Sequence, residues 1–232
     1  MIERLLKEKA WLLPILALVL ITPFTPNLDL SIANFFYQPA QHFSSNPFYT
    51  FLYNYGVLPA QIVFALSAIL LFLASFFKKW KKWHSPALVM VLSLLIGGGL
   101  IVHGILKEQW GRPRPKQVIE FGGNQSFRPY YQPNFHATEP SKSFSCGHCT
   151  MGFYFFALAL IARRLNYRKT FWAALALALG LGTLLSLARI AQGGHFLSDT
   201  LISALVMWLS AYACDRLVYE KESRWQNMRE DT

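Results

Sequence analysis

Acidic residues and cysteines are both scarce in this chain, and their scarcity excludes several classes of protein. Twelve Asp and Glu stand against 22 Lys and Arg, which gives a formal net charge of +10 at pH 7. Three cysteines are too few to form the disulfide framework on which small secreted domains depend. No basic stripe is interleaved with aromatic residues, so we expect no nucleic-acid partner. Internal repeats and low-complexity linkers are also missing, which favours a single domain over residues 1–232.

Charge of either sign is rare in the chain, and this indicates a membrane protein. Charged residues make up 15% of the sequence and hydrophobic residues 53%, which is too apolar for an ordinary soluble domain. A bilayer core of about 30 Å needs about 20 helical residues. Apolar runs of roughly suitable length lie at 11–25, 57–77, 86–106, 149–162, 171–188 and 196–218. We therefore predict an all-α integral membrane protein with six transmembrane helices.

The basic residues predict how these helices are oriented. They gather in the N-terminal segment, in 78–84, in 163–169 and in the tail from Arg216, all on one side if the runs alternate. By the positive-inside rule that side is cytoplasmic, and both termini lie there. The loops 26–56, 107–148 and 189–195 then face outward, which for a bacterial inner membrane means the periplasm.

The first apolar run has an alternative interpretation as a cleaved signal peptide. Basic residues precede it, and Ser31-Ile32-Ala33 loosely imitates a cleavage site. However, Pro23, Pro26 and Asp29 lie between the apolar core and that site. The segment LDLSIANFFY that follows is typical of an amphipathic helix at the membrane interface.

Basic residues in the outward loops break the positive-inside rule and need another explanation. Snorkelling to lipid headgroups is one, and convergence on an anion is the other. We favour convergence, because several of these residues fall in three short clusters, 107-KEQWGRPRP-115, 145-SCGH-148 and 189-RIAQGGHFLSD-199. The outward basic residues are Lys107, Arg112, Arg114, Lys116, Arg128, Lys142 and Arg189.

The first two clusters have local features of an anion site. Arg114 lies between two prolines, so its backbone is stiff and extended. Ser145 is a plausible N-cap of the helix over 149–162. The free N–H groups at that helix start, including the N–H of Gly147, together with the helix dipole favour a bound anion.

The third cluster supplies groups suited to phosphoryl transfer. Gly193 and Gly194 end one helix, and His195 opens the next with Asp199 on the same helical face. We expect His195 to attack phosphorus while Asp199 keeps its other ring nitrogen protonated, and His148 to protonate the leaving oxygen. The cations Lys107, Arg114 and Arg189 would balance a phosphate dianion. No carboxylate cluster is required, so neither a metal nor a cofactor is implied.

These clusters resemble the signature of the type 2 phosphatidic acid phosphatase superfamily. That signature reads Lys-x6-Arg-Pro, then Pro-Ser-Gly-His, then Ser-Arg-x5-His-x3-Asp. The matching residues are Lys107, Arg114 and Pro115; Gly147 and His148; and Arg189, His195 and Asp199. The resemblance covers about residues 100–200. It implies a phosphohistidine intermediate on His195 followed by hydrolysis without a metal.

Three positions depart from the signature. Ser145 replaces the proline, Cys146 replaces the first serine, and Ala188 replaces the serine before Arg189. A lost hydroxyl removes a hydrogen bond to a charged phosphate, worth roughly 1.5–3 kcal/mol. Ser145 and Cys146 nevertheless stand where phosphate contacts are expected. Arg112-Pro113 offers a second register for the first element, but the spacing favours Arg114.

The stretch CGHC also matches the spacing of a thiol–disulfide redox motif. A membrane disulfide oxidoreductase using Cys146 and Cys149 would need a second exposed pair, and Cys214 alone remains. A zinc site would need more ligands than these cysteines and one histidine. A milder hypothesis is a Cys146–Cys149 disulfide across the first helical turn, formed outside the cytoplasm and able to regulate the site.

The favoured function is hydrolysis of a phosphomonoester, or a diphosphate, of a membrane lipid. The stretches EFGG and QGGHFLSD resemble bacterial lipid A phosphatases, which favours lipid A phosphate. A phosphotransferase with a lipid or sugar acceptor is an alternative that uses the same site. An anion transporter is another, but the helix interiors offer few polar residues to line a path.

Three smaller expectations concern residues around these clusters. The loop 107–148 is a possible substrate lid, and its segment 117–142 is equally well explained as an interfacial loop anchored by aromatic residues. We expect His103 to be a buried histidine bonded to a neighbouring helix rather than part of the site. We expect Asp215 to pair with Arg216 or a loop lysine.

Overall fold

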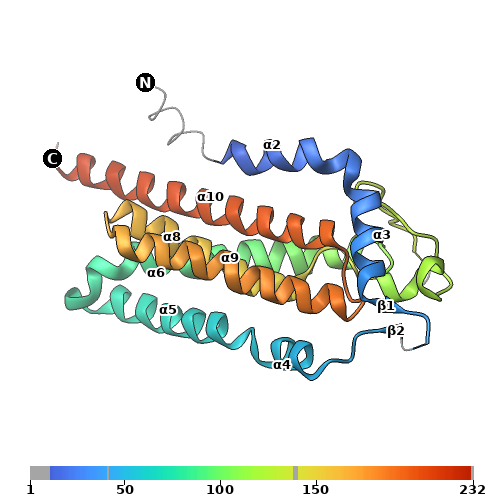
Figure 1. The fold of residues 1–232 in the computed structure, drawn as a ribbon. Coiled ribbons are helices and arrows are strands. Elements are labelled where there is room, and N and C mark those ends of the chain that lie inside the picture. Colours follow the sequence, from blue (N-terminus) through green and yellow to red (C-terminus); the bar gives the residue numbers. More distant parts are fainter. Residues whose placement is uncertain (1–10, 41, 138–140, 231–232) are drawn as a thin grey trace.

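The structure is a computed structural model that describes residues 11–40, 42–137 and 141–230, with side chains described up to residue 220. Helices running side by side make up most of it (Figure 1). The α-helices are α2 (Leu12–Ile21), α3 (Thr25–Phe36), α4 (Pro47–Tyr55), α5 (Leu58–Phe76), α6 (His84–Ser93), α7 (Gly147–Phe153), α8 (Phe155–Arg164), α9 (Arg168–Ala191) and α10 (Leu197–Glu230). The mostly helical class that the sequence predicted is confirmed.

Shorter and irregular elements connect these helices. The 3₁₀ segments are η1 (Thr22–Phe24), η2 (Lys78–Trp83), η4 (Pro115–Gln117) and η5 (Ile119–Phe121), and β1 (Tyr37–Gln38) pairs antiparallel with β2 (His42–Phe43). The segment η3 (Leu94–Lys107) is a π-helix that continues α6. Wide turns of this kind are frequent at functional sites, and this one ends on Lys107.

Among the described residues, helical segments long and apolar enough to cross a membrane are Leu12–Phe36, Pro47–Phe76, Lys78–Lys107, Arg168–Ala191 and Leu197–Glu220. The chain is therefore a multi-pass membrane protein. The predicted helix over 149–162 is interrupted at Tyr154, so α7 and α8 are each too short to span a bilayer alone. The number six remains a prediction, in which α7 and α8 together make the remaining crossing.

The bundle is apolar both in its interior and on part of its surface. Its core is centred on α7 and α8, where Phe153, Tyr154, Phe155 and Phe156 are all almost fully buried. In contrast, α5 exposes a stripe of large apolar side chains, at Ile62, Leu66, Ile69, Phe72 and Phe76. A contiguous exposed apolar face of this size fits contact with lipid.

The N-terminal segment bends before it reaches the bundle end. Pro23 and Pro26 flank the junction of η1 and α3, and proline cannot continue a helical hydrogen-bond pattern. The helix α3 consequently crosses the end of the bundle at a steep angle to α2 (Figure 1). It buries Thr25, Asp29 and Ala33 and leaves Phe35 exposed, so a helix at LDLSIANFFY is confirmed, while its position at the membrane interface remains a prediction.

A second apolar cluster lies beneath the long loop at the same end. Val118 and Phe121 of the loop are buried with Ala33 of α3 and with Phe196, and Phe127 packs edge-on against the Phe196 ring. The aromatic residues of this loop thus pack on the protein itself, and the interfacial position predicted for the segment 117–142 remains a prediction. Its role as a substrate lid remains a prediction.

The expected partner of Asp215 was wrong. Its carboxylate accepts hydrogen bonds from Arg164 Nε at 2.8 Å and Nη2 at 2.5 Å, whereas Arg216 bonds the hydroxyl of Tyr212. Arg164 ends α8, so this ion pair ties the end of α8 to α10 opposite the predicted site. Sequence spacing could not show that the two helices lie side by side there.

Candidate active site

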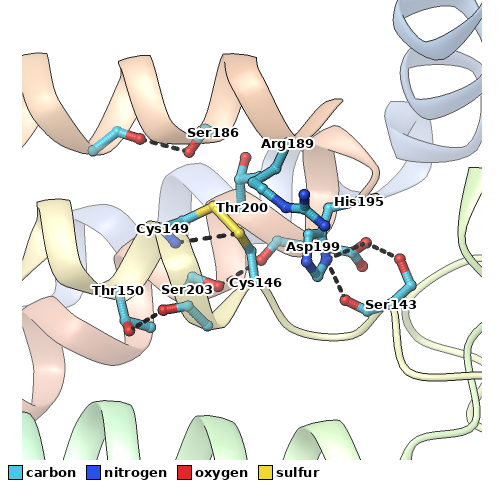
Figure 2. Close-up of a disulfide and its surroundings, with 12 residues drawn as sticks. Ser143, Cys146, Cys149, Thr150, Ser186, Arg189, His195, Asp199, Thr200 and Ser203 are labelled. Atoms are coloured by element: carbon cyan, nitrogen blue, oxygen red, sulfur yellow. Dashed lines mark hydrogen bonds and ion pairs between the residues drawn. A yellow bond between two sulfur atoms is a disulfide. The ribbon is translucent and has the colours of Figure 1, made fainter. Parts of the chain in front are cut away.

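The three sequence clusters converge at one end of the bundle. Lys107 ends η3, His148 lies in the first turn of α7, Arg189 lies in the last turn of α9, and His195 precedes α10. Lys107, Arg114, Arg189 and His195 are close enough to influence one another electrostatically, and His148 lies within reach of three of them. Figure 2 shows the Arg189 side chain pointing toward His195.

His195 is 3% exposed, and its Nδ1 has one close partner. The backbone oxygen of Ser143 lies 2.5 Å from Nδ1, whereas Asp199 Oδ2 lies 3.7 Å away, beyond hydrogen-bond distance. At 3.7 Å the carboxylate still forms an ion pair with the ring nitrogen, and the predicted role of Asp199 in holding His195 remains a prediction. With the proton on Nδ1 donated to Ser143, the lone pair is on Nε2, the nitrogen able to attack phosphorus.

Burial fixes the protonation state of this histidine. Removal from solvent lowers the pKa of His195, and the positive charges of Arg189 and Arg114 lower it further against the opposing effect of Asp199. The imidazole is consequently neutral at neutral pH. A neutral imidazole is the form that a nucleophile requires.

Asp199 acts on His195 through Ser143. Its Oδ2 accepts hydrogen bonds from Ser143 Oγ at 2.6 Å and from the Phe196 N–H at 2.8 Å. The carboxylate thus fixes both Ser143, whose oxygen contacts Nδ1, and the backbone next to His195, and its charge is placed to favour an imidazolium at His195. Ser143 was missed by the sequence analysis, because a serine in a loop carries no signal of its own.

Arg112 forms a buried ion-pair network behind the site. Its Nη1 donates to Asp199 Oδ1 at 2.5 Å and to Ser198 Oγ at 2.8 Å, and its Nη2 donates to Asp29 Oδ2 at 2.8 Å. Its Nε donates to the backbone oxygen of Arg128. Each guanidinium nitrogen therefore has a protein acceptor. The guanidinium also lies 4.5 Å from the ring centre of Phe196.

This network favours Arg114 over Arg112 as the arginine of the Arg-Pro element. Arg112 is committed to structural partners, while Arg114 is half-buried beside Lys107, Arg189 and His195. Asp29 was missed as a contributor. It is the only acidic residue in the segment 26–56, and that isolation was the available signal.

Arg189 has an incompletely satisfied guanidinium. Its Nη1 donates to Gln192 Oε1 at 2.8 Å, and its guanidinium lies 4.6 Å from the ring centre of Tyr53. Its Nε is buried and has no hydrogen-bond partner among the described residues, and the buried Oγ of Ser145 has none either. Buried polar atoms are normally paired, so these atoms are suited to a ligand that brings its own oxygens.

The start of α7 differs by one residue from the expected position. Cys146, not Ser145, is the N-cap, and α7 begins at Gly147. A Cβ at Gly147 would lie 2.4 Å from Nε2 of His103, so a residue without a side chain is needed there. His103 therefore lies beside the start of α7, and its side chain is exposed. The expectation that it is a buried histidine outside the site was wrong.

His148 is held by an aromatic ring that the sequence analysis missed. Its imidazole stacks on Tyr53 with centroids 4.4 Å apart and planes 12° apart. Burial, and then the charges of Arg189, His195 and Lys107, lower the pKa of His148 to about 4. At neutral pH these surroundings keep His148 neutral. A phosphate dianion would offset the surrounding charges and raise this pKa, giving an imidazolium able to donate a proton.

Cys146 and Cys149 form a disulfide across the first turn of α7, as the milder interpretation of CGHC predicted (Figure 2). Their Cα atoms are 5.3 Å apart. Cys146 Sγ also accepts a hydrogen bond from the Cys149 N–H at 3.2 Å. The Cys146 side chain therefore has no thiol to donate to a phosphate. The expected phosphate contact at this position is limited to the backbone.

Mass spectrometry after alkylation should detect this disulfide in protein purified without reductant. Denatured, unreduced protein should be alkylated at Cys214 alone, because the pair forms a disulfide and its predicted outward position lies in an oxidising compartment. Prior reduction should add alkylation at Cys146 and Cys149. A Cys149→Ser variant serves as control, since it should leave Cys146 reactive without reduction. Two freely alkylated thiols in the unreduced wild type would contradict the disulfide.

The site combines a cluster of cations, two histidines and unpaired buried polar atoms at one end of a bundle of membrane helices. This combination is typical of a membrane protein that binds phosphate. The sequence pattern of the PAP2 superfamily matches residues 86–223, and the chain belongs to this superfamily. The resemblance noted from the sequence is thereby confirmed, and the chain is a phosphatase.

Curated relatives support a narrower likeness to bacterial enzymes. The chain is 34% identical over 203 residues to a lipid A 4′-phosphatase of Francisella tularensis subsp. novicida, covering 85% of this chain and 89% of the relative. It is 32% identical over 119 residues to a lipid A 4′-phosphatase of Rhizobium leguminosarum, covering 51% of this chain and 47% of that protein. No solved structure matches the chain.

Proposed function

We propose that the chain is a lipid phosphate phosphatase that removes the 4′-phosphate of lipid A through a phosphohistidine on His195. The observation that carries the proposal is the buried, unpaired Nε of Arg189 beside the nucleophilic histidine. A phosphate oxygen is the acceptor that this donor lacks. The choice of lipid A is supported by the similarity to the Francisella enzyme over most of both chains.

The first chemical step transfers the phosphoryl group to the protein. The lone pair on His195 Nε2 forms the P–N bond as the bond between phosphorus and the lipid oxygen breaks. His148, protonated once the dianion is bound, gives its proton to that leaving oxygen. Lys107, Arg114 and Arg189 offset the charge on the equatorial oxygens.

The second step returns the site to its starting state. A water molecule attacks the phosphorus of phosphohistidine, and His148 takes the proton that the water loses. The P–N bond breaks, and inorganic phosphate leaves. His148 is then protonated again and His195 is neutral, so the cycle consumes only lipid and water. All proton and charge roles are filled by side chains, so we expect no metal to be needed.

The charge distribution supports an outward-facing site. The connections α5–α6 and α8–α9, which contain the basic segments 78–84 and 163–169, lie at the end of the bundle opposite the site (Figure 1). The segment 26–56 lies at the site end and contains no Lys or Arg. By the positive-inside rule the site opens on the periplasmic side of the inner membrane.

Phosphate release from a panel of lipid phosphates tests the proposed function. Purified wild type in detergent with EDTA should release phosphate from lipid A faster than from phosphatidic acid, phosphatidylglycerophosphate or undecaprenyl diphosphate. Mass spectrometry of the product should show loss of one phosphate, at the 4′ position. Rates with and without EDTA should agree within about twofold, since no step uses a metal.

The panel separates the parts of the proposal. Release from another lipid but not from lipid A would keep the phosphatase and reject the substrate. Loss of activity in EDTA that returns with a divalent ion would reject the metal-free mechanism. No release from any lipid, with the protein folded, would reject lipid phosphate hydrolysis.

A further inference from the structure

Tyr53 contacts two groups of the site at once. It lies in α4, whose end is placed by Gly56 against Leu185 of α9. Its ring stacks on the imidazole of His148 at 4.4 Å, and the guanidinium of Arg189 lies 4.6 Å from its centre. Tyr53 also precedes residues 86–223, the part of the chain that the PAP2 superfamily pattern matches. The superfamily pattern therefore does not account for it.

The chemistry of these contacts suits a positioning residue. An aromatic ring has a negative face, which attracts a guanidinium and also an imidazolium. Within the described part of the chain, Arg189 has one side-chain hydrogen bond, to Gln192, so the ring is a main restraint on where its unpaired Nε points. His148 is surrounded by positive groups, and the ring is a contact that favours its protonated form.

We propose that Tyr53 is a positioning residue, whose ring holds Arg189 in place for the phosphate and stabilises His148 as the imidazolium that protonates the leaving oxygen. This inference rests on the proposed function, because both roles belong to the same reaction. Both roles, the contact with Arg189 and the contact with His148, belong to the ring and not to the hydroxyl. Tyr53 is 37% exposed, so its ring is not fully enclosed by the groups that it contacts.

The charges around His148 make the effect measurable as a pH dependence. Arg189 from α9, His195 before α10, and Lys107 and His103 from η3 all disfavour its imidazolium. The Tyr53 ring from α4 opposes them. Removing the ring should lower the pKa of His148 with phosphate bound. Activity that requires a protonated His148 would then be lost at lower pH.

The test compares Tyr53→Leu, Tyr53→Phe and Tyr55→Leu with wild type in detergent. The Tyr55 ring is exposed and packs on Phe51, so its loss controls for removing a tyrosine from α4. Steady-state rates on lipid A give kcat and KM across pH. Binding of orthovanadate, a phosphate mimic, is followed by the rise in thermal stability.

Tyr53→Leu should lower kcat/KM roughly 3- to 30-fold, the range that a lost cation–π contact allows. The alkaline limb of its pH profile should move down by roughly half a unit to one unit, and orthovanadate should bind several-fold more weakly. Tyr53→Phe keeps the ring and should stay within about threefold of wild type. Tyr55→Leu should match wild type.

Several results would overturn the inference. The first is a Tyr53→Leu variant that matches wild type in rate, pH profile and vanadate affinity. The second is a Tyr53→Phe variant as impaired as Tyr53→Leu. The third is a fall in rate with neither the pH limb nor the vanadate affinity changed. If wild type releases no phosphate but binds orthovanadate, the proposed function fails and the vanadate affinities alone decide on Tyr53. If wild type does not bind orthovanadate, the inference falls too.

Discussion

His195→Ala should lower the rate of phosphate release from lipid A by roughly 10⁴-fold or more, because removal of a nucleophile abolishes the covalent route. The Nδ1 contact to the Ser143 oxygen leaves Nε2 with the lone pair, so the reacting nitrogen is already in the required tautomer. Release of inorganic phosphate from purified variants gives the rate. Phosphorus labelling of the protein, followed by alkaline gel electrophoresis, reports the phosphohistidine.

The neighbouring histidines provide the controls. His136 is exposed in the loop 107–148, and His136→Ala should have the activity of wild type. His148→Ala should release phosphate slowly yet still become labelled if the substrate has a good leaving group, since His195 is intact. Equal rates for His195→Ala and wild type would show that another group attacks phosphorus. Thermal unfolding of each variant in detergent shows whether a lost rate reflects lost structure.

The sequence predicted the residues of the site better than it predicted the buried residues that hold them in place. Motif spacing brought Lys107, Arg114, Arg189, His148 and His195 to one end of the bundle, because helix ends fix where loops lie. It could not show that Asp29, far away in the chain, would pair with Arg112. That contact depends on how α3 crosses the bundle end, which is set by the bend at η1 and by packing on Phe196.

Tyr53 and His103 show the same limit. Both lie on apolar helices, where an aromatic or a histidine has no periodic pattern that separates a site contact from a packing contact. Their proximity to His148 and Gly147 follows from the packing of α4 and η3 around α7. The break at Tyr154 was also invisible, because the run 149–162 is continuously apolar and its hydropathy does not register a local change of helix geometry.

Arg112→Met and Arg114→Met should affect different properties, the first stability and the second activity, although the two residues are separated only by Pro113. Arg112→Met leaves the carboxylates of Asp29 and Asp199 buried without their cation, at 1% and 0% exposure. Loss of one partner from a buried ion pair costs about 3–5 kcal/mol of unfolding free energy. Both the unfolding temperature in detergent and the yield of monodisperse protein should fall.

Arg114→Met should instead fold normally and lose activity. Its half-buried side chain lies beside the predicted phosphate site, so its loss should change stability by less than about 1 kcal/mol. Phosphate release should fall roughly 10²-fold, as when one donor to a transition-state oxygen is removed. If both variants are stable and Arg112→Met is the less active, the register is reversed and Arg112 binds phosphate.

A second substitution shows whether the loss at Arg112 arises from its network. Asp29→Asn removes one of the two carboxylates that Arg112 neutralises, so Arg112→Met combined with Asp29→Asn should be destabilised by less than the sum of the single effects. Additive losses would mean that Arg112 stabilises the protein by packing on Phe196 and Phe127 rather than by charge. Asp199 should keep its bonds to Ser143 and to the Phe196 N–H in the double variant. If the double variant is more stable and more active than Arg112→Met, the recovered activity would come from His195 still held in the orientation for attack.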